Sequence, residues 1–191
     1  VMPYQPEGIW NSPYNSDKWR MSTDGQQYRR AIYTFMKRTS PYPSMVTFDG
    51  TGRDICLSRR IRTNTPLQAL VTLNDSVFVD LSVHLARRAL ETFGRGTSES
   101  GTPMPGAPKP GAPMPGAPGQ YIDAAYKMAT GKPVSPEKKK ALVALYQKAY
   151  STYRKDPALC RALTAGTDAR LAAMVLVANT ILNLDEVITK T

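Results

Sequence analysis

Residue types that chemistry depends on are scarce in this 191-residue chain. It contains a single histidine, His84, and only two cysteines, Cys56 and Cys160. No HxxxH, CxxC or GxSxG spacing occurs, so no motif supports a metal site or a Ser/His/Asp triad. The CxxCH run of a c-type haem is missing, as is a glycine-rich phosphate loop before a helix. Two cysteines are too few for a disulfide framework, and a single Cys56–Cys160 bridge stays open.

Long apolar runs are also missing. The longest, Leu171 to Leu184, is broken by polar residues and is shorter than the roughly 18 residues that a membrane span needs. It predicts a buried core helix, so we expect no membrane span. The first residues, Val1 to Tyr4, lack the basic and apolar regions of a secretory leader.

Proline and positive charge are abundant instead. The 16 prolines among 191 residues are nearly twice what the average usage of about 5% would give, so part of the chain should be irregular. Its net charge of +10 is compatible with nucleic acid, anionic polysaccharide or acidic lipid, but requires none of them.

The front of the chain predicts loops and a small β element. Residues 1–27 show no periodicity and read as an extended arm, anchored by Trp10 and Trp19. Residues 28–37 alternate bulky side chains and predict a strand covered on both faces. Residues 45–48 predict a second short strand that ends at the Asp49-Gly50 turn.

Helix signals dominate the rest. Thr65 and Gln68 form a predicted capping box with Pro66 at the first helical position, and Leu67, Leu70 and Val71 as the apolar face. Asp75 should cap a second helix that runs to about residue 93, with Phe78, Leu81, Leu85 and Ala89 buried. Later caps are predicted at Gly131, Ser135, Asp156 and Thr167.

These patterns predict a mainly α protein: a helical body with a small β element and long irregular N-terminal loops. We divide it into an arm, short strands and capped helix pair (1–94), a Pro/Gly-rich linker (95–119), and C-terminal helices on the same core (120–191). The linker repeats a Pro-x-Pro-Gly-Ala pentapeptide three times, which is typical of a semi-extended spacer.

One candidate binding surface combines arginine with aromatic side chains, as binders of anions, sugars or single strands do. Its members are Arg29, Arg30, Arg59, Arg60, Arg62, Tyr33 and Tyr42. The alternative is structural: the arginines hold loops through multidentate contacts, for which arginine is better suited than lysine. We favour the structural interpretation, and expect no catalytic, cofactor or metal residues.

A second alternative is one half of a split hydrolase or oxidoreductase. Its candidate residues here are Asp49, Asp54, Asn64 and Asp75, which should then converge in one cleft with a perturbed carboxylate. His84 lies between Asp80 and Arg88 on a polar helix flank, and Cys56 has no nearby histidine. The sequence favours a non-catalytic module over an enzyme without deciding between them.

Five ordered blocks carry a resemblance to a known family. They are residues 1–10 (VMPYQPEGIW), 28–39 (YRRAIYTFMKRT), 44–49 (SMVTFD), 59–75 (RRIRTNTPLQALVTLND) and 176–186 (LVANTILNLDE). The chain resembles the C-terminal part of the planctomycete-type domain of unknown function numbered fifteen-fifty-three. That domain is found in large exported bacterial proteins, which often carry a c-type haem domain.

The resemblance carries expectations that composition alone does not. It implies a periplasmic, cell-surface or extracellular location, and a partner in the N-terminal part of the same domain, on this or another polypeptide. It allows c-type haem only in a parent protein, with no cofactor in this chain. Anionic polysaccharide is a second candidate partner, and nucleic acid is disfavoured. The family supplies no established catalytic residues.

Overall fold

A computed structural model describes residues 1–5, 7–9, 18–23, 25–37, 40–50, 58, 63–94 and 117–188. The chain divides into two compact units, Val1–Val71 and Thr72–Thr191, which are considered separately below. The described residues are mainly helical, which confirms the predicted class. The predicted segment boundaries stay a prediction, since most of the predicted linker lies outside these residues.

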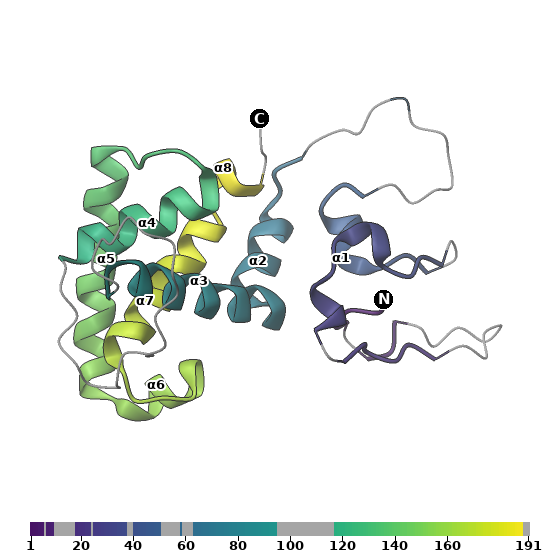
Figure 1. The fold of residues 1–191 in the computed structure, drawn as a ribbon. Helices are drawn as coiled ribbons and strands as arrows, with labels where there is room; N and C mark the ends of the chain where they lie inside the picture. Colours follow the sequence, from purple (N-terminus) through teal and green to yellow (C-terminus); the bar gives the residue numbers. More distant parts are fainter. Residues whose placement is uncertain are drawn as a thin grey trace, which may run out of the picture. The chain divides into compact units, whose positions relative to one another are not determined.

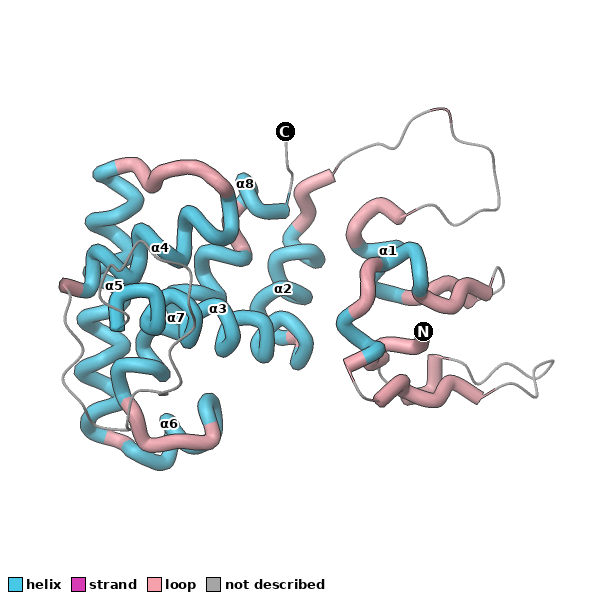
Figure 2. The backbone as a smooth tube through the Cα atoms, viewed as in Figure 1, coloured by secondary structure: helices cyan, strands magenta, loops and turns pink. Residues whose placement is uncertain are grey.

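The first unit consists mostly of loops and short turns of helix (Figure 2). It contains two 3-10 helices, η1 (Gln26–Tyr28) and η2 (Ala31–Tyr33), and a one-turn helix α1 (Pro43–Thr47). Helix α2 (Pro66–Asn74) begins in this unit. Because such short elements have few internal hydrogen bonds, their positions depend on contacts between segments.

Residues 1–5 run as an extended arm held by side chains from later segments. The Trp19 indole N–H donates to the Pro3 carbonyl (2.9 Å), and the Tyr42 hydroxyl donates to the Tyr4 carbonyl (2.7 Å). The two rings stack with centroids 5.8 Å apart. The predicted Trp19 anchor is therefore confirmed for residues 1–5, while Trp10 lies outside the described residues.

The predicted strand over residues 28–37 is wrong. This segment forms η2 at its centre, and Ile32, expected to be covered, is 84% exposed. Only one isolated bridge, Lys37 to Ser40, occurs in the described residues. Alternation of bulky side chains is a local signal, whereas a strand needs a neighbouring edge that pairs along its length. Val1 pairs with this segment only locally: its ammonium donates to the Tyr33 carbonyl and its carbonyl accepts the Phe35 N–H, both at 2.7 Å.

The second predicted strand, residues 45–48, is also wrong. These residues lie in α1 and the turn after it. Pro43 sits at the start of α1, where its fixed φ favours helix and its missing N–H costs nothing. The turn ends as predicted at Asp49-Gly50, where Asp49 has φ 58° and the Gly50 N–H donates to the Met45 carbonyl (2.6 Å).

The second unit is a helical bundle built around α7 (Ala169–Leu182) (Figure 1). Helices α3 (Ser76–Gly94), α4 (Pro118–Thr130), α5 (Pro136–Lys155) and α6 (Pro157–Thr164) all pack against it. The short α8 (Asp185–Ile188) follows. Helix α7 is apolar on nearly all sides, which is the pattern of a fully buried helix. The core helix predicted from the longest apolar run is thus confirmed.

Most predicted helix boundaries are confirmed by their caps. Asp75, Ser135 and Asp156 each accept a hydrogen bond from a backbone N–H of the following helix, and Gly131 ends α4 with φ 75°. The cap of α7 was placed one residue early. Asp168, rather than Thr167, accepts the Arg170 N–H at 2.8 Å, since a carboxylate is the stronger acceptor.

Two predicted apolar faces need correction. In α2, Leu67 and Leu70 are exposed, while the polar Gln68 and Thr72 are buried and hydrogen-bonded. In α3, Leu81 is exposed, and the buried residues are Ser82, Val83, Ala86, Ala89 and Leu90. This α3 stripe keeps the helical period but is offset from the prediction, and its small side chains suit the close packing of α3 on α7.

Within the described part of the chain, no helix alone combines the length and apolar character needed to cross a membrane. Two bent pairs, α2 with α3 and α6 with α7, reach that threshold only when each pair is taken together.

Candidate functional site

The densest group of polar contacts lies in the first unit, at the entry to α2. We call it the polar junction: the side chains of Asp49, Thr63, Thr65 and Gln68, with the carbonyl of Thr47. The Asp49 carboxylate accepts the Thr63 backbone N–H at 2.7 Å and the Thr63 hydroxyl at 2.8 Å, so both of its oxygens are engaged. The turn after α1 is thereby bound to the segment that begins α2.

Gln68 completes the polar junction from inside α2. Its amide nitrogen donates to the Thr47 carbonyl (2.9 Å) and to the Thr63 hydroxyl oxygen (3.1 Å). Its amide oxygen accepts the Thr65 N–H (3.0 Å), and its own N–H donates to the Thr65 hydroxyl (3.4 Å). The predicted capping box is therefore confirmed. Gln68 is only 1% exposed, so these bonds satisfy a buried amide.

The electrostatics of the junction suit a structural carboxylate. The backbone N–H and then the hydroxyl of Thr63 lower the pKa of Asp49 below its usual value. A lowered pKa keeps the carboxylate ionised at neutral pH and makes it a poor proton donor or acceptor. A general acid or base would instead need a pKa moved towards the working pH.

Of the three other candidates for a split enzyme, one caps a helix, one is exposed and one lies outside the described residues. Asp75 accepts the Val77 N–H at 2.8 Å as the cap of α3. Asn64 is exposed just before α2, and Asp54 is not among the described residues. The described carboxylates of this group thus serve to begin a helix and to close a turn.

The arginine-aromatic residues fall into three groups. Arg29 and Arg30 are exposed, and the Arg29 guanidinium lies over the Tyr33 ring, 5.7 Å from its centroid. Tyr33 is itself 57% exposed, so one face of the pair is accessible. Tyr42 is buried under Trp19 and acts in the fold of the arm. The third group, Arg59, Arg60 and Arg62, lies outside the described residues.

His84 and Cys160 are placed as ordinary helix residues, while Cys56 lies outside the described residues. His84 is exposed, with its Nε2 3.8 Å from Asp80 one turn away. Cys160 is fully buried, and its thiol donates to the Tyr153 carbonyl at 3.4 Å. In the ranges that the structure describes, no group of three or more His, Cys, Asp or Glu could hold a metal ion.

Sequence reasoning missed the ion pairs of the second unit. Lys138, near the exposed start of α5, pairs with Glu186, which also accepts the Tyr126 hydroxyl. The Lys138 ammonium and then the Tyr126 hydroxyl lower the pKa of Glu186. Lys139 pairs with Asp123 at 2.6 Å. No local signal predicts these pairs, because the partners lie 48 and 16 residues away.

The comparisons with known proteins give one match. A family model described as "Protein of unknown function (DUF1553)", PSD1, matches residues 1–146. The match covers the polar junction, the arginine-aromatic residues and helices α1 to α4. No curated protein and no solved structure matches the chain.

Proposed function

Since the chain belongs to the DUF1553 family of proteins of unknown function, we propose that it is a non-catalytic structural or interaction module of a larger exported protein. The polar junction carries this proposal. Both Asp49 carboxylate oxygens accept hydrogen bonds from Thr63 and the pKa of this carboxyl is lowered, so Asp49 holds two segments together. That arrangement builds a scaffold and does not present a reactive group to a substrate.

Turnover measurements test this role. The purified chain and its Asp49→Asn variant are assayed with chromogenic esters, phosphate esters and glycosides. Asparagine keeps the size of aspartate and tolerates a positive φ, so the fold is retained while the charge is removed. We expect both proteins to match the buffer rate. A multiple-turnover rate that the substitution abolishes would refute the proposal and support the split-enzyme alternative.

The setting of the module is a further part of the proposal. The family resemblance supports a place in the C-terminal part of a longer polypeptide, and an envelope or extracellular location. It also supports a c-type haem domain in a parent protein; this chain itself has no CxxCH run to attach one. Protease accessibility of the tagged native protein in intact cells tests the location. Haem staining of the whole native protein, with this chain as the unstained control, tests the association.

A second candidate function is binding of an anionic polysaccharide through the arginine-aromatic residues. The accessible Arg29–Tyr33 pair favours it, because a guanidinium beside an exposed ring offers both charge and a stacking face. Binding to a sulfated glycan should weaken with rising salt and in the Arg29→Ala/Arg30→Ala double variant. The Arg59→Ala/Arg60→Ala variant tests the arginines that precede α2 in the sequence. Arg154→Ala, an exposed change on α5, is the control. An affinity that changes neither with salt nor in either double variant would exclude polysaccharide binding through these residues.

A further inference from the structure

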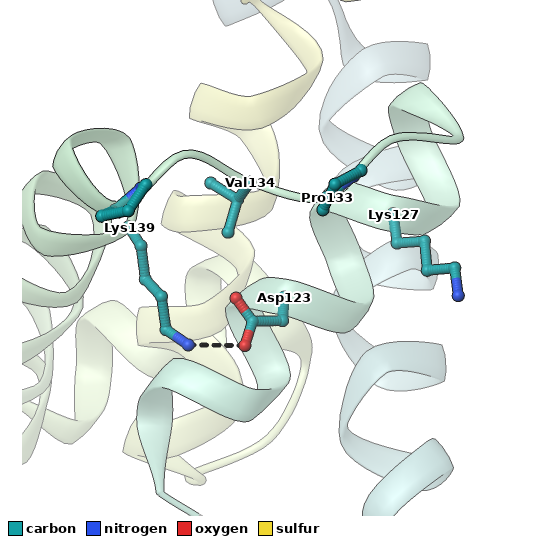
Figure 3. A pocket seen from close by; sticks show the side chains of 6 residues that line it. Asp123, Lys127, Pro133, Val134 and Lys139 are labelled. Carbon is teal, nitrogen blue, oxygen red and sulfur yellow. Dashed lines mark hydrogen bonds and ion pairs between the residues drawn. The ribbon is translucent and has the colours of Figure 1, made fainter.

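A pocket of about 480 Å³ opens where α4 turns into α5. It is lined by Asp123, Lys127, Pro133, Val134, Pro136 and Lys139. Figure 3 shows these side chains around the connecting loop, with Val134 between Lys139 on one side and Pro133 on the other. The size is within the range of small-ligand sites, and the apolar lining with a few polar groups is also typical of them.

The charges at this pocket do not balance. Lys139 is neutralised by Asp123, whose carboxylate lies 2.6 Å from the Lys139 ammonium. The Lys139 side chain also packs closely against Gly119, which helps to fix its position. A Cβ added at Gly119 would lie only 2.9 Å from Lys139 Cε. Lys127 also lines the pocket, and its ammonium extends away from this ion pair (Figure 3). Within the described residues, no acidic side chain pairs with Lys127.

The positive charge that remains at the pocket is that of Lys127. Pro136 is the first residue of α5, and the partial positive charge of this helix end is offset by Glu137 in the first turn. The apolar surfaces of Pro133, Val134 and Pro136 lie next to it. A ligand that fits both features has an anionic group for Lys127 and an apolar body for the proline-valine wall.

We propose that this pocket binds an organic carboxylate with an apolar body, whether a free acid or a glutamate side chain in an extended peptide. The Lys127 ammonium swings onto the carboxylate, while Pro133, Val134 and Pro136 contact the apolar part. Asp123 keeps Lys139 in place and sets the edge of the pocket. This proposal is independent of the structural role above, since it depends only on residues 118–139 of the second unit.

Amide NMR titration of the whole chain tests the proposal, with Gly131, Lys132 and Val134 as reporters beside the pocket. Benzoate and benzamide form a matched pair that differs in charge, and inorganic phosphate supplies charge without an apolar body. We expect saturable benzoate binding with Kd on the order of 1–10 mM. Benzamide and phosphate should each bind at least about threefold more weakly, the size of one exposed ion contact or a little more.

The variants locate the effect. Lys127→Ala should weaken benzoate binding about threefold, whereas Lys148→Ala, an exposed lysine further along α5, should leave it unchanged. Blocked Pro-Glu-Pro and Pro-Gln-Pro peptides separate the two sources. A preference for the glutamyl peptide identifies a peptide ligand, and binding of benzoate alone identifies a free acid. Equal binding of benzoate and benzamide, equal binding of phosphate, or no loss in Lys127→Ala would overturn the proposal.

Discussion

Each of the two units of this chain is stabilised internally by a different kind of interaction. In the first, only Pro3, Tyr42 and Gln68 are buried among the described residues, and order comes from hydrogen bonds between side chains and the main chain. In the second, α7 alone contributes seven apolar residues that are almost completely inaccessible: Ala172, Ala173, Met174, Val175, Val177, Ala178 and Ile181. Apolar burial is non-directional, whereas each hydrogen bond specifies one partner.

This difference shows how segments without regular structure acquire a defined position. A loop has too little apolar surface to bury, so its backbone groups need particular partners. The polar junction supplies them with a few side chains in the first unit. The second unit achieves stability through contact area, and its polar pairs, such as Lys138–Glu186, lie at the surface. We therefore expect the first unit to depend on single residues and the second on packing volume.

The largest effect should come from a cavity in the second unit. Met174 is fully buried in α7, and Met174→Ala should lower the free energy of unfolding by about 2–5 kcal/mol. Helical circular dichroism reports mainly on this unit, while both tryptophans, Trp10 and Trp19, belong to the first. Denaturant titration should therefore shift the dichroism midpoint and leave the fluorescence midpoint unchanged.

The control for this cavity is Leu176→Ala, because Leu176 lies on the same helix but is 38% exposed. Its cost should be clearly smaller than that of Met174→Ala. If tryptophan fluorescence and dichroism shift together in Met174→Ala, the two units unfold as one, and the contrast between them does not extend to their stability.

The next effect tests the first unit. Gln68→Ala removes a buried side chain that bonds Thr47, Thr63 and Thr65. Buried groups left without partners cost about 1–3 kcal/mol, so the fluorescence midpoint should fall while the dichroism midpoint changes little. Gln147→Ala, at an exposed position of α5, is the matched control and should move neither. A neutral Gln68→Ala would show that the polar junction does not stabilise the first unit.

Sequence reasoning succeeded where the signal is local. The Thr65–Gln68 capping box, the Gly131 stop and the Ser135 cap each involve residues within one turn, and all three are present. Helix α7 was predicted because residues 171–184 form the longest apolar run in the chain. These features are decided by neighbours along the chain, so they are readable without knowing the fold.

It failed where the partner is distant in sequence. The segment 28–37 forms no strand because its main-chain pairing with Val1 is confined to Tyr33 and Phe35. Leu67 is exposed although it is apolar, and the polar Gln68 takes the buried position. The bond between Asp49 and Thr63 joins residues 14 apart, with no period to indicate it. Burial and long-range pairing are tertiary properties, and they override local preference.

Backbone changes at two helix ends should have effects of about 1 kcal/mol or less. Gly131 (φ 75°) and Ala165 (φ 56°) both end helices of the second unit in the left-handed region. Gly131→Ala introduces strain into open space and should cost about 1 kcal/mol. Ala165→Gly relieves the same strain, but glycine loses more conformational entropy on folding. The free energy of unfolding should therefore rise by only about 0.5 kcal/mol. Thermal denaturation followed by dichroism measures both, and shifts of the same sign would contradict this account.

Acid should weaken the two units through different carboxylates. Asp49 in the first unit and Glu186 in the second both have lowered pKa values in the folded state, so the unfolded chain binds protons more readily. Their contributions to the free energy of unfolding are complete above the usual carboxyl pKa of about 4. These contributions are lost as the pH falls through the lowered pKa values of the folded state. Between about pH 5 and pH 2, both midpoints should therefore fall.

Single substitutions assign each loss to its carboxylate. Asp49→Asn should flatten the acid dependence of the fluorescence midpoint and leave that of the dichroism midpoint unchanged, while Glu186→Gln should do the reverse. The effect of Glu186 should be the smaller, because its Lys138 pair is exposed and solvent screens it. An acid response of the first unit that survives Asp49→Asn would show that its stability depends on other carboxylates, and that the lowered Asp49 pKa has little weight in holding the turn to α2.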